Sequence, residues 1–202
     1  MLYLTRYGRR VSRMADKKTD RRALKTRKAI FEAFAELMCE KELRNITVQD
    51  ISDKADIHRV TFYKHFMDIY DVYEQLENMI LTELGSLVTG FGDKPMDEVY
   101  SEVFGYIREN PKYFKMVFSP HNSNVLYQKM LKLIVGFKRM VWAESLGVDM
   151  TDARVDNAIR YHCNGGFAII AEWVLNDFDQ PQERITEMLS GFEKSTRSLL
   201  EK

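Results

Sequence analysis

The segment between residues 58 and 66 carries side chains that can bind nucleic acid. Arginine can donate two hydrogen bonds to guanine, and lysine, tyrosine and histidine can donate to phosphate oxygens. Here such residues alternate with Phe62 and Phe66, whose rings favour a buried position. A short helix with one apolar and one polar face has the form required to enter the major groove. The polar side chains free to face outward are Arg59, Thr61, Tyr63, Lys64 and His65.

No set of residues in the sequence is typical of an enzyme. The four histidines are scattered, and Cys39 and Cys163 lie far apart in apolar helical patterns, as reduced thiols of a cytoplasmic protein do. His58 has no second ligand at metal-site spacing, and no phosphate loop is found. We therefore expect no catalytic residues, no metal and no cofactor. An enzyme would bury residues 58–65 or line a cleft with them, whereas a DNA-binding protein would expose them as a basic ridge.

The charges are unevenly distributed along the chain. The formal net charge is zero, but residues 1–66 hold 16 lysines and arginines against 9 acidic residues, and residues 67–202 hold 14 against 21. This excess favours phosphate binding by the first third of the chain. A solvated basic tail is the alternative for the first residues. Residues 1–13 have two interpretations: they form a disordered basic arm, or the start codon has been assigned too far upstream and the protein begins at Met14.

Apolar spacing predicts two short helices after a first long one. The first runs from about Asp20 to Lys41, with Ile30, Phe34 and Leu37 on one face. Thr47 can cap a second helix that begins at Val48, because Asp50 stands three residues further on. This helix ends near Ala55, and the pattern resumes at Arg59. Two short helices across a tight turn fit a helix-turn-helix, although such pairs also occur as plain packing. The expected small core is Ile51, Ala55, Ile57, Phe62 and Phe66.

The rest of the chain also reads as helix, and no βαβ alternation is present. Only ten glycines and four prolines interrupt it, and no stretch approaches the roughly 20 apolar residues of a membrane span. We predict an all-α fold of about nine helices and no membrane partner. The predicted units are a flexible basic arm (1–19), a helix-turn-helix domain (20–67) and a helical dimerisation and effector domain (68–202). The later helices are expected over 68–89, 96–109, 111–118, 123–145, 151–176 and 181–201.

The stretch ITVQDISDKADIHRVTFYKHF, continued by MDIYDVYEQL, resembles the tetracycline-repressor (TetR) family of bacterial regulators. That signature has a Thr-capped helix, an Ala-Gly-Val turn, a Thr-Phe-Tyr recognition helix and a His-Phe ending. The run YHCNGGFAIIAEWVLNDFDQPQERITEML further resembles the C-terminal domain of a subgroup that includes a regulator linked to dihydroxyacetone kinase. The resemblance implies a homodimer that binds a double-stranded operator and acts more often as a repressor than as an activator.

The resemblance also assigns roles to residues of the predicted helix-turn-helix. Arg59, Val60 and Thr61 would read bases, and Gln49 occupies another base-contact position of the family. Backbone contacts are implied for the remaining residues, with simple solvated surface as the alternative for Gln49 and Lys64. These remaining residues are Thr47, His58 at the turn, Tyr63, Lys64 and His65.

Three positions depart from the family pattern. Asp56 stands where the family has a turn glycine and would have to adopt the left-handed conformation at some cost. Val60 replaces a small residue. Ile69 replaces a lysine that often contacts phosphate, so one phosphate contact is expected to be lost, and the basic residues before Leu24 can compensate.

The last two predicted helices carry apolar seams that need a partner. In the first, residues step by three or four along one face, and Gly165 and Gly166 allow close approach of a neighbouring helix. We predict a four-helix interface across a two-fold axis, with ordinary intramolecular core as the alternative. The predicted interface residues are Ile159, His162, Gly166, Ile169, Trp173, Met188 and Phe192.

The second domain holds more aromatic and methionine side chains than a small bundle needs. They can line a pocket for a small apolar or aromatic effector, although plain core explains each of them as well. The alternative for the whole domain is binding of a partner protein instead of a metabolite. The predicted pocket residues are Phe104, Phe114, Phe118, Tyr127, Met130, Phe137, Trp142 and Tyr161, with Tyr106 and Met116 as further candidates.

Overall fold

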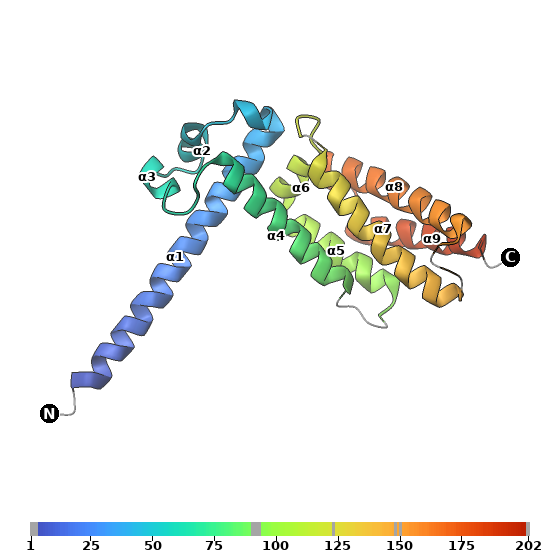
Figure 1. Ribbon diagram of the computed structural model, residues 1–202, viewed down its shortest axis with the longest axis horizontal. Helices are drawn as coiled ribbons and strands as arrows, with labels where there is room; N and C mark the ends of the chain where they lie inside the picture. Colours follow the sequence, from blue (N-terminus) through green and yellow to red (C-terminus); the bar gives the residue numbers. More distant parts are fainter. Residues whose placement is uncertain (1–3, 90–93, 123, 148, 150, 201–202) are drawn as a thin grey trace.

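The computed structural model describes residues 4–89, 94–122, 124–147, 149 and 151–200, with side chains from residue 21 onward. These residues form nine α-helices and one short 3-10 turn and include no strand, which confirms the predicted all-α fold (Figure 1). In chain order the elements are α1 (Leu4–Glu40), η1 (Leu43–Asn45), α2 (Val48–Lys54), α3 (Arg59–Phe62), α4 (Ile69–Thr89), α5 (Met96–Glu109), α6 (Pro111–Phe118), α7 (Val125–Leu146), α8 (Ala153–Leu175) and α9 (Gln182–Ser198).

The predicted helix boundaries agree with the structure to within about two residues, except in α1, in α3 and at the end of α9, which lies at Ser198 against a predicted end at residue 201. Helix α1 begins at Leu4, well before the predicted start near Asp20. The side chains before residue 21 lie outside the described residues, so the basic arm stays a prediction. Helix α3 ends as an α-helix at Phe62, and residues 63–65 continue it as turns in which the amide of Phe66 donates to the carbonyl of Phe62.

Helices α1, α2 and α3 share one apolar core with the start of α4. Ile30, Phe34, Ile51 and Phe62 are completely buried, and Phe66 is almost so. Ala55 and Ile57 are half-buried and pack against this core. Each large apolar side chain of this core contributes about 1.5–3 kcal/mol when buried.

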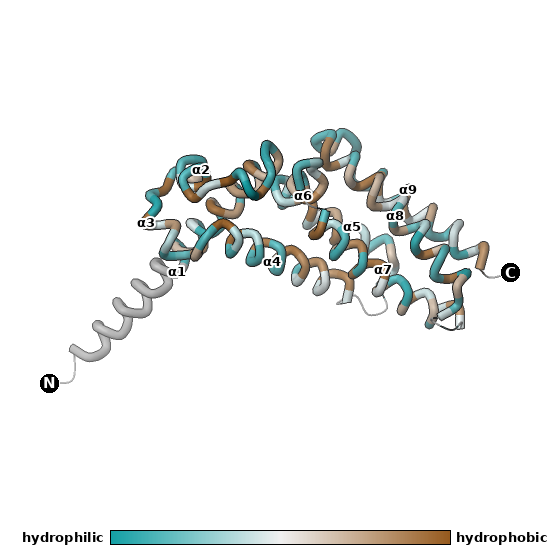
Figure 2. Tube along the Cα trace, turned by 45° about the horizontal axis from the view of Figure 1, so that its top comes forward, coloured by the Kyte–Doolittle hydropathy of each residue, from teal (hydrophilic) through white to brown (hydrophobic). Residues whose placement is uncertain are grey.

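Helices α5 to α9 form a bundle at the other end of the molecule, and α4 runs from the first domain along it (Figure 1). Helix α7 packs against α8 and α4, and α5 packs against α9. Along α4 and α8 the trace alternates between apolar and polar stretches, as expected for helices with one buried face (Figure 2). Among the helices described, none combines the length and apolar content that a membrane crossing needs.

Helix α6 connects the two parts of the molecule. It packs against both α1 and α8. Lys112 of α6 forms ion pairs of 2.8 Å with Glu32 and Glu36 of α1, while Lys54 of α2 pairs with Glu36 at 3.4 Å. These pairs are partly exposed, so each adds at most about 1 kcal/mol. They fix the orientation of α2 and α6 on the same face of α1.

Candidate functional site

The turn between α2 and α3 has the local geometry that the sequence predicts. The Thr47 hydroxyl accepts a hydrogen bond from the Asp50 amide at 3.1 Å, and the Asp50 carboxylate accepts one from the Thr47 amide at 2.8 Å. Asp56 adopts the left-handed conformation with φ of 52°. The Thr47 cap begins α2, and the left-handed Asp56 follows the end of α2 and turns the chain toward α3.

Helix α3 presents its polar side to solvent. Phe62 and Phe66 anchor it in the core, and the centroids of their rings lie 5.9 Å apart. Val60 is 70% exposed and Tyr63 is 53% exposed. The other predicted contact residues of α3 and its turns are exposed or half-exposed: His58, Arg59 and Lys64 are exposed, and Thr61 and His65 are half-buried.

The two predicted contact residues of α2 are also exposed. Thr47 is engaged in the cap of α2, so its hydroxyl is already hydrogen-bonded. The Gln49 amide donates to Asp53 at 2.6 Å, and it would have to leave this partner to reach a base. The side chain of His58 makes no capping hydrogen bond at the start of α3, unlike that of Thr47 in α2.

Arg27 of α1 supports the end of the α3 turn, a role that the sequence did not reveal. Its guanidinium lies 4.7 Å from the centroid of the Phe66 ring, and it donates to Gln75 of α4 at 2.6 Å and to the carbonyl of His65 at 3.5 Å. Burial, together with the charges of Arg27 and Lys64, lowers the pKa of His65. Near neutral pH His65 is therefore an uncharged donor. Arg27 is one of eleven basic residues between Arg6 and Lys28, and the sequence does not distinguish it from the others. Its contacts with the α3 turn are seen only in the structure.

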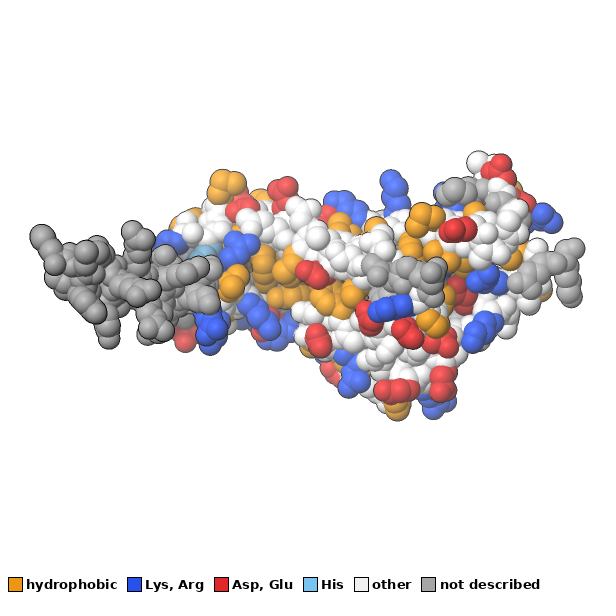
Figure 3. All heavy atoms as spheres, turned by 90° about the horizontal axis from the view of Figure 1, so that it is seen from below, with side chains coloured by type: hydrophobic (Ala, Val, Ile, Leu, Met, Phe, Trp, Pro, Cys, Tyr) orange, Lys and Arg blue, Asp and Glu red, His pale blue; other side chains and the backbone are white. Residues whose placement is uncertain are grey.

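Basic side chains gather at the end of the molecule that carries α2 and α3. In Figure 3 lysine and arginine side chains and a histidine are visible at this end together with several acidic side chains, and basic and acidic groups are mixed over the other end as well. A band of apolar side chains separates the two regions on this face. The exposed face of α3 can therefore meet an anionic surface and offers hydrogen-bond donors to it.

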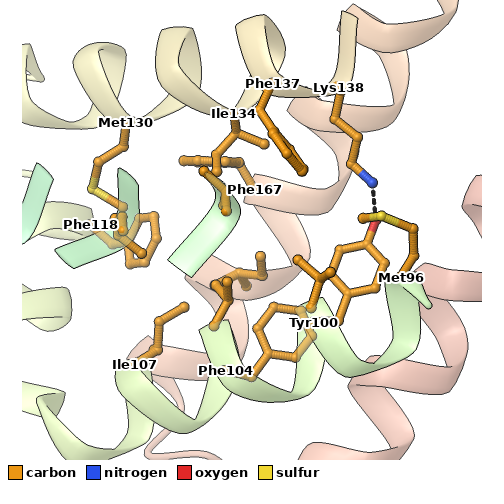
Figure 4. Close-up of a pocket in the computed structure, with 15 residues that line it drawn as sticks. Met96, Tyr100, Phe104, Ile107, Phe118, Met130, Ile134, Phe137, Lys138 and Phe167 are labelled. Atoms are coloured by element: carbon orange, nitrogen blue, oxygen red, sulfur yellow. Dashed lines mark hydrogen bonds between the residues drawn. The ribbon is translucent and has the colours of Figure 1, made fainter. Parts of the chain in front are cut away.

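The second domain encloses a narrow cavity between α4, α5, α6, α7 and α8 (Figure 4). Its volume is about 70 Å³, against roughly 300–1,000 Å³ for the pockets of drug-sized ligands. Four of the predicted pocket residues line it, namely Phe104, Phe118, Met130 and Phe137. The others that line it are Leu84, Val88, Met96, Val99, Tyr100, Val103, Ile107, Ile134, Lys138, Phe167 and Ile170.

The remaining predicted pocket residues lie elsewhere. Phe114 is fully buried in the main core, and Tyr127 packs edge-on against Phe118 and Phe167 behind the cavity wall. Trp142 is buried in a separate small cluster with Ile159. Tyr161 is 78% exposed on the outer face of α8. Aromatic content alone does not predict which of these side chains line the cavity and which lie in the core or on the surface, because the packing of the helices decides this. Tyr106 and Met116 likewise lie outside the cavity wall.

The predicted dimer residues divide between the interior and an outer groove. Ile159 and Trp173 are buried within the chain, so their seam faces the chain's own core. His162, Gly166, Ile169 and Phe192 line an outer groove of about 590 Å³ between α8 and α9. Met188 is half-buried beside it. This groove also holds Tyr161 and Leu199, both largely exposed.

A buried polar cluster lies between the cavity and this groove. We call it the α5–α9 polar cluster, and it consists of Tyr100, Lys138, Trp142, His162 and Glu193. Lys138 and Glu193 form an ion pair, and the side chain of each is 3% exposed. Trp142 donates to Glu193 at 2.9 Å, and Tyr100 donates to Glu193 at 2.7 Å.

The sequence contains a signal for this cluster in the spacing of two charged residues. Lys138 stands in a row of apolar residues four apart, after Met130 and Ile134 and before Trp142, and Glu193 follows Ile185 and Leu189 in the same way. Two opposite charges inside apolar rows of different helices indicate a buried pair, since an unpaired charge would be too costly to bury.

The polar cluster has a defined charge state. Burial acts to raise the pKa of Glu193, but the Lys138 ammonium and the donors around it hold that pKa below its ordinary value. Burial lowers the pKa of Lys138, and the charge of Glu193 opposes this effect. Burial and the Lys138 charge lower the pKa of His162 to about 4. The direct contact of Lys138 with Glu193 pairs a cation with an anion, and the lowered pKa of His162 leaves this histidine neutral at neutral pH.

Comparison with known proteins gives consistent matches. Residues 95–194 match the family described as the transcriptional regulator C-terminal region of TetR proteins. The HTH-type transcriptional regulator YxbF of Bacillus subtilis is 35% identical over 77 residues, which are 38% of this chain and 20% of that protein. The chain therefore spans about one fifth of the length of this relative.

Solved structures share the fold. The dihydroxyacetone kinase operon activator DhaS is similar with a TM-score of 0.57 and 19% identity, covering 86% of this chain and 97% of that one. A TetR-family regulator from Streptomyces coelicolor gives a TM-score of 0.60 and 14% identity over 86% and 82%. One from Mesorhizobium loti gives 0.57 and 13% over 88% and 98%.

Proposed function

We propose that this chain is a transcriptional regulator of the TetR type, which its matches to such regulators support. It binds operator DNA as a homodimer through α3 and represses transcription until a small effector binds its second domain. The observation that carries the proposal is the exposed polar face of α3, which Phe62 and Phe66 hold outward from the core. A catalytic role would instead require residues 58–65 to be buried or to line a cleft. The two cysteines are free thiols, in keeping with action in the reducing cytoplasm.

Base reading is assigned to Arg59 and backbone contact to Lys64. Arg59 stands at the first position of α3, where it can donate two hydrogen bonds to guanine. Lys64 lies beyond the end of the helix and is assigned to phosphate. Gln49 can read adenine once it releases Asp53. Tyr63, Thr61, Val60, His58, His65 and Thr47 complete the proposed contact surface.

The test is an electrophoretic mobility shift with DNA from beside the chain's own gene. Arg59→Ala should reduce the preference for operator over scrambled DNA by about 1–3 kcal/mol. Lys64→Ala should weaken binding to both DNAs alike and lower the salt slope by about one. Glu187→Ala, an exposed position on α9, is the matched control. Unchanged binding by both variants would contradict the docking of α3. A reporter gene distinguishes repression from activation.

Dimerisation is proposed to use the outer groove of α8 and α9. Phe192 and Leu199 are 50% and 73% exposed there, and Tyr161 lies beside them, so a second copy would cover apolar area that is costly to leave in water. Phe192→Asp should shift sedimentation from dimer to monomer and weaken operator binding, while Glu187→Ala should leave both unchanged. A dimer that survives Phe192→Asp and Leu199→Asp together would exclude this face.

A second candidate is a regulator whose second domain binds a partner protein. The narrow cavity of about 70 Å³ and the open groove of about 590 Å³ favour it. If the groove serves a different protein, the purified chain should sediment as a monomer at all concentrations. A concentration-dependent dimer supports the first proposal.

A further inference from the structure

Arg27 of α1 lies on the core side of the α3 turn, which we define as residues 63–66. Its guanidinium is 4.7 Å from the ring centroid of Phe66 and 5.5 Å from that of Phe31, and both rings are buried. Tyr63 and Lys64, by contrast, are the exposed residues of this turn. Arg27 is therefore placed to hold the turn from within, whereas Lys64 faces solvent.

Side chains of α1 and α4 hold the backbone at the end of the α3 turn. Arg27 donates to the carbonyl of His65 and to the side-chain oxygen of Gln75 in α4. The Gln75 amide donates to Asp71 at 2.6 Å, and the Asp71 carboxylate accepts from the amide of Met67 at 2.8 Å. We call Arg27, Gln75 and Asp71 the Arg27 bridge. It closes a ring of contacts that runs from α1 through α4 and back to the turn.

The bridge depends on the shape of arginine and not only on its charge. A guanidinium is planar, so it can lie over a ring while its N–H bonds point to two acceptors in different directions. A lysine ammonium is a point charge and lacks this flat face. Both acceptors of Arg27 in the bridge, the His65 carbonyl and the Gln75 amide oxygen, are uncharged. The directions of the N–H bonds therefore matter more here than the charge.

The bridge fixes one end of α3. The amides of His65 and Phe66 both donate to the carbonyl of Phe62, the last residue of α3. A displacement of residues 65–67 would therefore move the helix with it. The other end of α3 follows the left-handed turn at Asp56. With both ends held, α3 keeps one orientation relative to α4.

We propose that Arg27 is a positioning residue for operator binding: it fixes α3 against α4 through the turn and Gln75, and it makes no contact with DNA itself. The inference rests on the proposed DNA-binding function and adds how the helix that enters the groove is held. Operator affinity should then depend on Gln75, an uncharged residue of α4, as much as on Arg27. An arginine that contacted phosphate directly would act through its charge.

Two substitutions test the bridge by mobility shift with the operator DNA used above. Arg27→Lys keeps the charge and removes the planar donor, whereas Gln75→Met keeps a similar size and removes the acceptor. Each should weaken operator binding by about tenfold, as the loss of one base contact does. The double variant should bind no more weakly than either single one, because both changes break the same unit. Arg184→Lys and Gln128→Met, at exposed positions of α9 and α7, are the matched controls and should bind like the native chain.

The free chain gives a second readout that does not depend on DNA. Arg27→Lys and Gln75→Met should both shift the NMR amide signals of residues 64–67, because these residues end the turn that the bridge holds. The signals of α2, which makes no contact with the bridge among the residues described, should stay in place. Thermal unfolding of the same samples shows that each variant is folded.

Three results would overturn the proposal. Native operator affinity of Arg27→Lys would show that charge suffices and would make Arg27 a phosphate contact. Native affinity of Gln75→Met would show that the bridge does not hold α3, and fully additive losses in the double variant would show that the two residues act separately. If the native chain binds no operator DNA, the proposed function fails, and the amide signals of residues 64–67 still decide whether the bridge holds the turn.

Discussion

His162 should make the stability of the protein depend on pH between about 4 and 6.5. Its pKa is about 4 in the folded chain and 6.5 in the unfolded chain, because burial and the neighbouring Lys138 disfavour the imidazolium. Tyr100, Trp142 and Glu193 also face the ring, and Cys163 is its neighbour on α8. Between these two pH values the unfolded state binds more protons, so stability falls as the pH falls.

The size of the effect follows from the two pKa values. Each pH unit of difference corresponds to about 1.36 kcal/mol, so acidification from pH 7 to 4.5 should cost roughly 2.5 kcal/mol through His162 alone. The side chain is 5% exposed, so solvent screening reduces this little. Protonation of His65 and of the carboxylates whose pKa is lowered in the folded chain also reduces the stability of the protein over this range. Only a comparison with a variant therefore isolates the contribution of His162.

The assay is urea unfolding of the native chain and of His162→Gln at one protomer concentration from pH 4.5 to 7. Glutamine keeps an amide donor for Tyr100 but does not titrate. Its stability relative to the native chain should therefore rise by roughly 2.5 kcal/mol as the pH falls from 7 to 4.5. A constant difference across this range would show that His162 is not held neutral in the folded chain and would refute the reasoning.

Substitutions at three further sites test local features by thermal or urea unfolding. Thr47→Ala should cost about 1 kcal/mol by removing the cap of α2, and Thr47→Ser should restore it. Asp56→Gly should stabilise the turn by up to about 1 kcal/mol whereas Asp56→Ala should destabilise it, because φ is positive there; the same sign for both would contradict the strain. Glu193→Ala should cost about 3–5 kcal/mol by leaving Lys138 buried without a counter-charge, and adding Lys138→Met should recover most of the loss. An effect of Glu193→Ala no larger than that of the exposed Glu187→Ala would show that the pair is solvated.

The sequence by itself determined the features that arise from neighbours along the chain. The cap between Thr47 and Asp50 and the left-handed turn at Asp56 depend on residues within three positions of each other. Helix ends and apolar faces follow from the same short range, since a helix repeats its faces every three to four residues. For that reason the helix-turn-helix, its exposed residues and most helix boundaries were predictable.

Only the tertiary structure decided what each apolar face packs against. Ile159 and Trp173 could equally have met a second copy, but they pack inside the chain, while Phe192 of the same predicted interface remains exposed. The Lys138–Glu193 pair joins helices 55 residues apart in the sequence, and Tyr100 reaches Glu193 across 93. The periodicity of apolar residues within one helix cannot determine such pairings, because each contact needs a second helix. The free energy that selects the pairings comes from apolar surface that several helices bury together.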